Sequence, residues 1–156
     1  MRRDYFEVTV ENVDWVETGD DPAKPTVRID FRGPEDLLRD QLTDADGELL
    51  DADRTDVSFR LHGEPDDPDA TGVVAVANRV TGDFVLELNE DVEDVLAFIR
   101  AAREYGKHAD GDGRYRVHIG IDGDRIVTYD KRTFLVYDAD GNLLRNESLI
   151  PSGVEL

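Results

Sequence analysis

Apolar and polar residues alternate along five segments of this chain, and this alternation constrains the fold more than any other feature of the sequence. A period of two places every second side chain on one face of an extended strand, so each segment predicts a strand with one buried and one solvated face. Two further runs, 73–76 and 134–137, are apolar at every position and predict strands covered on both faces. The alternating apolar positions are Phe6, Val8 and Val10; Val27, Ile29 and Phe31; Val57, Phe59 and Leu61; Phe84, Leu86 and Leu88; and Tyr115, Val117, Ile119 and Ile121.

Turn sequences join several of these segments. Thr81-Gly82-Asp83 and Asp140-Gly141 each separate two apolar stretches, and Asp122-Gly123 is the strongest hairpin signal in the chain. Strands joined by short turns pair antiparallel. We therefore expect a mostly antiparallel sheet of about 7–9 strands, ending in a C-terminal antiparallel meander at about 114–150.

Two helices are expected beside the strands. A long one at about 90–106 follows Asn89, which suits the N-cap position, and ends at Gly106. Its acidic residues fall in the first turns and its basic residues in the last turns, which matches the helix dipole. A short helix at about 34–42 begins with Pro34. The sequence thus predicts an α+β fold, and its 156 residues predict a single domain over 1–156.

Acidic residues outnumber basic ones by about two to one. The chain has 37 Asp and Glu against 18 Lys and Arg, which gives a net charge of −19. Only 3 of the bases are lysine, and short carboxylates with few long lysine stems are typical of a protein that folds in molar KCl. At about 1 M salt the screening length is only about 3 Å, so the self-repulsion largely disappears. The composition therefore predicts a halophilic protein. We also expect it to be cytoplasmic, because the sequence shows neither a secretory signal nor an apolar run of about 20 residues.

Several segments, taken in order, resemble a known family. They are the opening Met1-Arg2-Arg3-Asp4-Tyr5-Phe6, then Thr81-Gly82-Asp83-Phe84 before the helix stretch 96–103, then Tyr129-Asp130-Lys131-Arg132-Thr133, and finally 148–155. Together they resemble an uncharacterised family of small acidic proteins of haloarchaea. The resemblance covers nearly the whole chain and implies a halophilic single-domain protein. It implies no activity and no catalytic residue.

The sequence offers no motif that carries chemistry. It has no cysteine, which excludes thiolate zinc sites and cysteine nucleophiles, and it has neither a nucleophile elbow nor a phosphate-binding glycine loop. Two acidic loops beginning at Asp44 and Asp138 lack the glycine and glutamate positions of an EF-hand and are better explained as turns. We therefore predict no catalytic residue, no cofactor and no metal, and an enzyme is the less favoured class.

Arginine and histidine side chains occupy polar positions on several predicted strands. If these strands share one sheet, the side chains form a candidate binding face of Arg28, Arg60, His62, Arg116 and His118. Arginine binds anions at short range, where salt screens least. Cross-strand ion pairs with Glu7, Asp30 and Glu87 would also explain the arginines, and we favour that interpretation. The strand order decides between the two.

The C-terminal segment is unusually apolar for the end of a chain. Its apolar residues form a candidate docking tail of Leu149, Ile150, Val154 and Leu156. The interpretation that we favour is docking on the protein's own sheet. Binding of a partner, by strand addition or in a groove, is the other.

These features favour a non-catalytic binding or adaptor protein with a protein partner. The support is the lack of catalytic motifs together with two candidate docking surfaces. An enzyme or small-ligand protein with an unrecognised pocket is the alternative. Association with nucleic acid through the arginine-bearing face is a third hypothesis. No membrane partner is expected, and the oligomeric state stays open.

Overall fold

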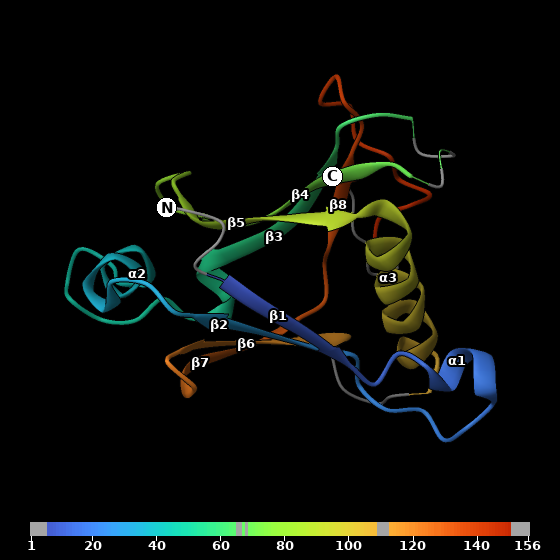
Figure 1. Ribbon diagram of the computed structural model, residues 1–156, viewed down its shortest axis with the longest axis horizontal. Coiled ribbons are helices and arrows are strands. Elements are labelled where there is room, and N and C mark those ends of the chain that lie inside the picture. The colour runs from blue at the N-terminus through green and yellow to red at the C-terminus, as the bar shows by residue number, and fades with distance from the viewer. Residues whose placement is uncertain (1–5, 65–66, 68, 109–112, 151–156) are drawn as a thin grey trace.

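The structure is a computed structural model that describes residues 6–64, 67, 69–108 and 113–150. Within these residues, eight strands form two four-stranded sheets whose inner faces share one core (Figure 1). The first sheet has the order β1 (Phe6–Glu11), β2 (Thr26–Phe31), β6 (Tyr115–Ile121) and β7 (Asp124–Lys131). The second sheet has the order β5 (Phe84–Asp91), β4 (Thr71–Asn78), β3 (Thr55–Leu61) and β8 (Leu135–Tyr137).

Most neighbouring strands pair antiparallel, and each sheet has one parallel pair. These pairs are β2 with β6 in the first sheet and β3 with β8 in the second. The predicted α+β class with one long helix is confirmed. The strands divide into two mixed sheets, however, and the expected single sheet is not formed.

Three α-helices accompany the sheets in the described part of the chain. They are α1 (Trp15–Thr18), α2 (Glu35–Leu42) and α3 (Val92–Gly106), and a 3-10 turn, η2, covers Ala52–Arg54. The long helix α3 begins two residues later than predicted, because β5 continues through Asn89 to Asp91, which takes the N-cap position. Figure 1 shows α3 beside the open end of the two sheets and α2 at the opposite end.

The predicted C-terminal meander is only half formed. β6 and β7 make the expected hairpin, whose turn residues Asp122 and Gly123 both have positive φ angles of 51° and 86°. After β7 the chain leaves the first sheet, and β8 pairs parallel with β3 in the second. The physical reason lies at Lys131, whose ammonium group donates hydrogen bonds to the carbonyl oxygens of Ala52 and Thr55, each at 2.6 Å. These bonds hold the end of β7 against the start of β3, so the chain continues into the second sheet.

The core lies between the two sheets and continues under α3. Phe31 from the first sheet and Phe59 from the second are fully buried in the same cluster. At the helix end of the core, Phe98 of α3 packs edge-on against Tyr115 and Phe134, with ring centroids 5.5 and 6.4 Å apart. No helix within the described residues is both long and apolar enough to span a bilayer.

Candidate functional site

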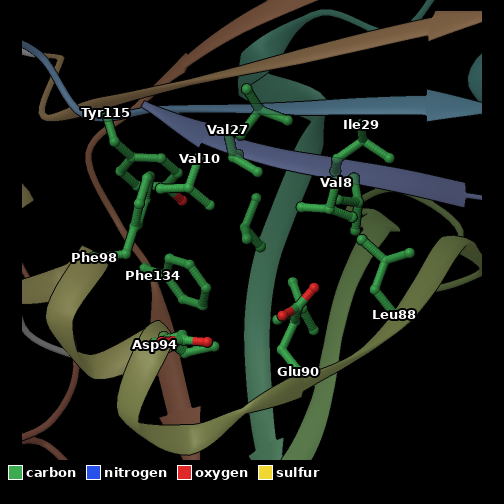
Figure 2. Close-up of a pocket in the computed structure, with 15 residues that line it drawn as sticks. Val8, Val10, Val27, Ile29, Leu88, Glu90, Asp94, Phe98, Tyr115 and Phe134 are labelled. Atoms are coloured by element: carbon green, nitrogen blue, oxygen red, sulfur yellow. The ribbon is translucent and has the colours of Figure 1, made fainter. Parts of the chain in front are cut away.

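An apolar cleft opens between the inner faces of the two sheets, where the edge strands β1 and β5 both contribute to its lining (Figure 2). Its volume is about 70 Å³. The remaining walls come from the interior strands of both sheets and from α3. The lining residues are Val8, Val10, Val27, Ile29, Val57, Val74, Val76, Leu88, Glu90, Asp94, Val95, Phe98, Tyr115, Val117 and Phe134.

The choice of side chains explains why this space stays open. Eight of the fifteen lining residues are valine. Two packed sheets lie about 10 Å apart, and valine is too short and too stiff at χ1 to reach across that gap. On the edge strand β1, Val10 pairs with Val27 of β2 and keeps 48% of its surface exposed. The cleft therefore reaches solvent beside β1 and presents an apolar wall there.

Two carboxylates, Glu90 of β5 and Asp94 of α3, belong to the lining and lie near each other in Figure 2. Burial raises the pKa of Glu90, and the negative charges of Asp94 and Asp91 raise it further. Among the described residues, neither Glu90 nor Asp94 has an ion pair or a side-chain hydrogen bond. The cleft thus combines apolar walls with negative charge that no cation of the described chain neutralises.

The other polar group of the lining, the hydroxyl of Tyr115, is already occupied. It donates a hydrogen bond to the carbonyl oxygen of Thr133 at 2.6 Å, and its complete burial raises the pKa well above the ordinary value. The lining holds no serine, histidine or lysine. A general acid or base needs a partner group within reach of the substrate. The arrangement is therefore suited to binding an apolar group that carries a positive charge.

The structure places the residues of the predicted binding face on two different sheets. Arg28, Arg116 and His118 lie on the outer face of the first sheet, where Arg28 and His118 are neighbours in the β2–β6 register. Arg60 lies on β3 of the second sheet, and His62 directly follows that strand. The five residues therefore do not form one surface. The strand order, which periodicity alone does not give, separates them.

Cross-strand ion pairs do form on the outer face of the first sheet. The Nε atom of Arg28 lies 2.5 Å from a carboxylate oxygen of Glu11, and that of Arg116 lies 3.0 Å from Asp130. Arg32 lies within 3.2 Å of Glu7 and within 2.9 Å of Asp30. On the second sheet, by contrast, Arg60 donates to the carbonyl oxygen of Ala139 at 3.0 Å, and His62 lies 3.4 Å from the Thr71 hydroxyl.

The predicted docking tail is described only in its first half. Leu149 is buried and exchanges two backbone hydrogen bonds with Phe134, at 2.9 and 3.0 Å. Ile150 is half-buried. Leu149 thus pairs with Phe134 of the same chain, the residue directly before β8. Val154 and Leu156 lie outside the described residues.

The two acidic loops are hydrogen-bonded turns. Asp44 accepts backbone hydrogen bonds from Asp46 and Glu48, and Asp138 accepts them from Asp140 and Asn142. These bonds lower the pKa of both carboxyls, and for Asp44 the larger cause is the hydrogen bond from Arg54. No group of three or more metal-ligating side chains occurs in the part of the chain that the structure describes.

Sequence reasoning missed the carboxylates of the cleft. Glu90 and Asp94 are among the acidic residues in the first turns of the predicted long helix, where the helix dipole alone explains them. The available signal was the period of β5, because Glu90 follows Leu86 and Leu88 at intervals of two and therefore shares their inward face. An acid at an inward position of a strand points to a binding role more strongly than one at a helix start.

The chain matches the model of the family of unknown function DUF5793 over residues 1–156 and belongs to that family. No curated protein and no solved structure matches it. The geometry of the cleft is therefore the basis for any functional proposal.

Proposed function

We propose that this protein is a non-catalytic binding or adaptor protein, and that it holds an extended segment of a partner protein along the cleft. The observation that carries the proposal is the pair Glu90 and Asp94, two carboxylates without a cationic partner in the described chain, beside an apolar cleft. We further propose a halophilic, cytoplasmic setting, and the acidic composition supports the high-salt part of this proposal.

The size of the cleft favours a single side chain over a whole ligand. Its 70 Å³ is about half of the roughly 150 Å³ cavity that accepts benzene, and far below the roughly 300–1,000 Å³ of pockets for drug-sized molecules. One leucine, isoleucine or valine side chain of a partner fits such a space. Burying that side chain contributes about 1.5–3 kcal/mol.

The negative charge of the cleft indicates which residue of the partner should stand beside that aliphatic side chain. A lysine or arginine beside the apolar group would neutralise Glu90 and Asp94. Glu90 is half-buried, and ion pairs at partly desolvated positions are screened less by salt than exposed ones. Such an ion pair would therefore still contribute to the binding free energy at the high salt concentration that the composition indicates.

The edge strand β1 offers a backbone template for the segment. Arg116 N–H donates to the Pro25 carbonyl, and Asp122 N–H donates to the Phe31 carbonyl, so the odd-numbered residues of β2 direct their backbone groups toward β6. The even-numbered residues of β2 therefore bond to β1, and their partners there are Glu7, Thr9 and Glu11.

The backbone groups of Val8 and Val10 consequently point away from β2, to the edge of the first sheet that no described strand covers, while their side chains line the cleft. A strand added at this edge would place its own inward side chains directly opposite Val8 and Val10. Inward side chains recur every second residue. The preferred segment thus carries an aliphatic residue and a basic residue two positions apart.

Peptide binding tests the proposal. A fluorescent peptide with leucine and arginine two residues apart is titrated with the protein in about 1 M KCl, beside peptides in which glycine replaces leucine or glutamate replaces arginine. We expect saturable binding of the first peptide and at least about tenfold weaker binding of the other two. Equal binding of all three peptides, or of none, would contradict the proposal.

A matched pair of variants assigns the binding to the cleft. Asp94→Asn removes a carboxylate that lines the cleft, whereas Glu93→Gln removes an equal charge from the preceding residue of α3, which does not line it; both side chains are exposed. Only Asp94→Asn should weaken the leucine–arginine peptide. A second copy of the chain is the competing occupant of the cleft, and light scattering that shows a dimer dissociated by Asp94→Asn would replace the peptide proposal with self-association.

A further inference from the structure

We propose a second binding site on the outer face of the first sheet, where Arg28, Arg125 and His118 bind a small oxyanion, that is, the phosphate or carboxylate group of a ligand. This site lies on the face of the sheet opposite the cleft and does not depend on the proposed function. It takes up part of the predicted arginine face and adds Arg125, which sequence reasoning did not include.

The site is a depression of about 240 Å³ that spans the four strands of the first sheet. Arg28 of β2 and His118 of β6 are register neighbours, and Gly120 of β6 pairs with Arg125 of β7. All four residues line the depression. The parallel pairing of β2 with β6 therefore brings together residues that are about ninety positions apart in the chain.

A β-bulge directs Arg125 to this face. Ile119 pairs with Val127, but the next residue, Gly120, pairs with Arg125, so Ile126 is the extra residue of the bulge. Without the shift, Ile126 would lie opposite Gly120, and an apolar side chain would occupy the edge of the depression. Bulges re-aim side chains in this way beside functional sites.

Gly120 keeps the floor of the depression low. A Cβ atom at this position would lie 2.9 Å from the carbonyl oxygen of Asp124 and 3.3 Å from a carboxylate oxygen of Asp30. Any residue larger than glycine at position 120 would project a side chain between His118 and Arg125. The bulge and the glycine together leave room for a ligand of a few atoms.

His118 is held in a fixed orientation at this site. Only 8% of its surface is exposed, and its Nδ1 atom lies 2.8 Å from the Thr128 hydroxyl oxygen. If that hydroxyl donates to Nδ1, the imidazole carries its proton on Nε2. The Nε2 atom has no hydrogen-bond partner among the described residues, so it is available to donate to a ligand.

Positive charge gathers around this imidazole. Burial is the largest cause that lowers the pKa of His118, and nearby guanidinium groups lower it further, against the charge of Glu11. These groups belong to Arg125, Arg28 and Arg116. A bound anion would offset their effect and raise the pKa of His118, so anion binding and protonation of His118 are coupled.

The ion pairs on this face do not neutralise all of its arginine side chains. Arg32 is neutralised by Glu7 and Asp30, and the pair of Arg28 with Glu11 uses its Nε atom. Arg125 has no ion pair among the described residues. Its guanidinium and the Nη groups of Arg28 can present the planar fork that suits a carboxylate or phosphate oxygen pair.

The net charge of the lining is small, and this limits the charge of the ligand that the site can bind. The lining has the arginines Arg28, Arg32 and Arg125 against the acids Glu7 and Asp30, while neutral His118 adds nothing, so its net charge is about +1. Arg116 of the same strand, Asp130 of β7 and Glu11 of β1 lie on the same outer face as His118. A ligand group with one negative charge matches this balance best.

NMR of the histidine side chains tests the site, because the chain has only three histidines. Inorganic phosphate and acetate are each exchanged for chloride at constant ionic strength, and the His118 Cε1–H signal is followed against pH. We expect at least one of the two anions to raise the pKa of His118 saturably while His108 is unaffected. Phosphate alone would identify a phosphoryl ligand, and acetate alone a carboxylate. No effect of either anion would overturn the proposal.

Two variants locate the anion. Arg125→Gln should weaken its binding by at least about tenfold, since a hydrogen bond to a charged group contributes about that much. Arg100→Gln removes an equal charge from an exposed position of α3 and should leave the affinity unchanged. Both arginines are exposed, so neither variant should unfold. Equal affinity in the Arg125→Gln variant and the native protein would show that the anion does not bind at this site.

Discussion

The ammonium group of Lys131, the last residue of β7, lies 2.6 Å from the carbonyl oxygen of Thr55, the first residue of β3. Lys131 is buried, and it also donates to the carbonyl oxygen of Ala52. A single side chain thus connects the first sheet to the second at the point where the chain passes between them. Cross-sheet contacts of this kind fix how the two sheets meet and hence the shape of the cleft.

Replacing Lys131 should therefore destabilise the fold. The variant Lys131→Met keeps the length of the side chain but leaves two carbonyl groups without their donor, and we expect a loss of about 2–4 kcal/mol in the free energy of unfolding. Urea denaturation followed by circular dichroism measures this loss. Lys107→Met is the control, because Lys107 is exposed and, among the described residues, forms an ion pair only with Glu104; it should change stability by less than about 0.5 kcal/mol. Equal losses in the two variants would show that the Lys131 contacts do not hold the sheets together.

Salt should stabilise the protein strongly. Its net charge of −19 repels itself at low ionic strength, and the repulsion is screened at high ionic strength. The melting temperature in about 2 M KCl should exceed that in about 0.1 M KCl by 10 °C or more, an effect that corresponds to a few kcal/mol in a chain of this size. Sucrose at matched osmolality serves as the control for general exclusion effects. A melting temperature that does not respond to KCl would leave the acid excess without its halophilic explanation.

The pKa of Glu90 predicts a trade-off between stability and binding. Because the folded state raises this pKa above its unfolded value, the ionised Glu90 destabilises the fold at neutral pH, and the cost disappears as the pH falls below the unfolded value. Glu90→Gln should therefore be slightly more stable than the native protein at pH 7, by a few tenths of a kcal/mol because the group is still partly solvated. The difference should vanish near pH 4, where Glu90 is protonated. A Gln variant that is less stable at pH 7 would show that Glu90 has a stabilising partner.

The outer edge of β1, which no strand of the described part of the chain covers, predicts where proline is tolerated. Val8→Pro removes an N–H group that points away from β2, whereas Thr9→Pro removes one that bonds to β2. Proline is compatible with edge strands when the lost N–H faces outward. Val8→Pro should keep the fold and abolish peptide binding, while Thr9→Pro should lower the melting temperature markedly. A Val8→Pro variant that is folded and binds the peptide normally would exclude strand addition at this edge.

The strands and the long helix could be predicted from periodicity, because burial on one face imposes a period of two on strands and of 3.6 on helices. Phe6, Val8 and Val10 lie on β1 as expected, and the hairpin at Asp122-Gly123 is formed. The division into two sheets could not be predicted in this way. It depends on contacts such as those of Lys131 with Ala52 and Thr55, which join residues more than seventy positions apart.

The same limit applies to the sites. Arg28 and His118 lie side by side, because both occupy outward positions of strands that turn out to be neighbours. Arg60 and His62 have the same local pattern, but their strand belongs to the other sheet. Arg125 was missed because a bulge, which leaves no trace in the simple alternation, turns it to the outer face. Periodicity gives the face of a strand, and only the tertiary pairing gives its neighbours.

Charge reversal at the cleft tests the central claim most directly. In the double variant Glu90→Lys with Asp94→Lys, the cleft should reject the peptide that carries arginine beside leucine and bind the one that carries glutamate there. The matched control, Glu93→Lys with Asp140→Lys, changes the net charge of the protein equally at exposed positions outside the cleft lining and should keep the original preference. The account predicts that the ratio of the two peptide affinities inverts, by at least about tenfold in each direction. A ratio that is the same in the cleft variant and in the native protein would contradict it.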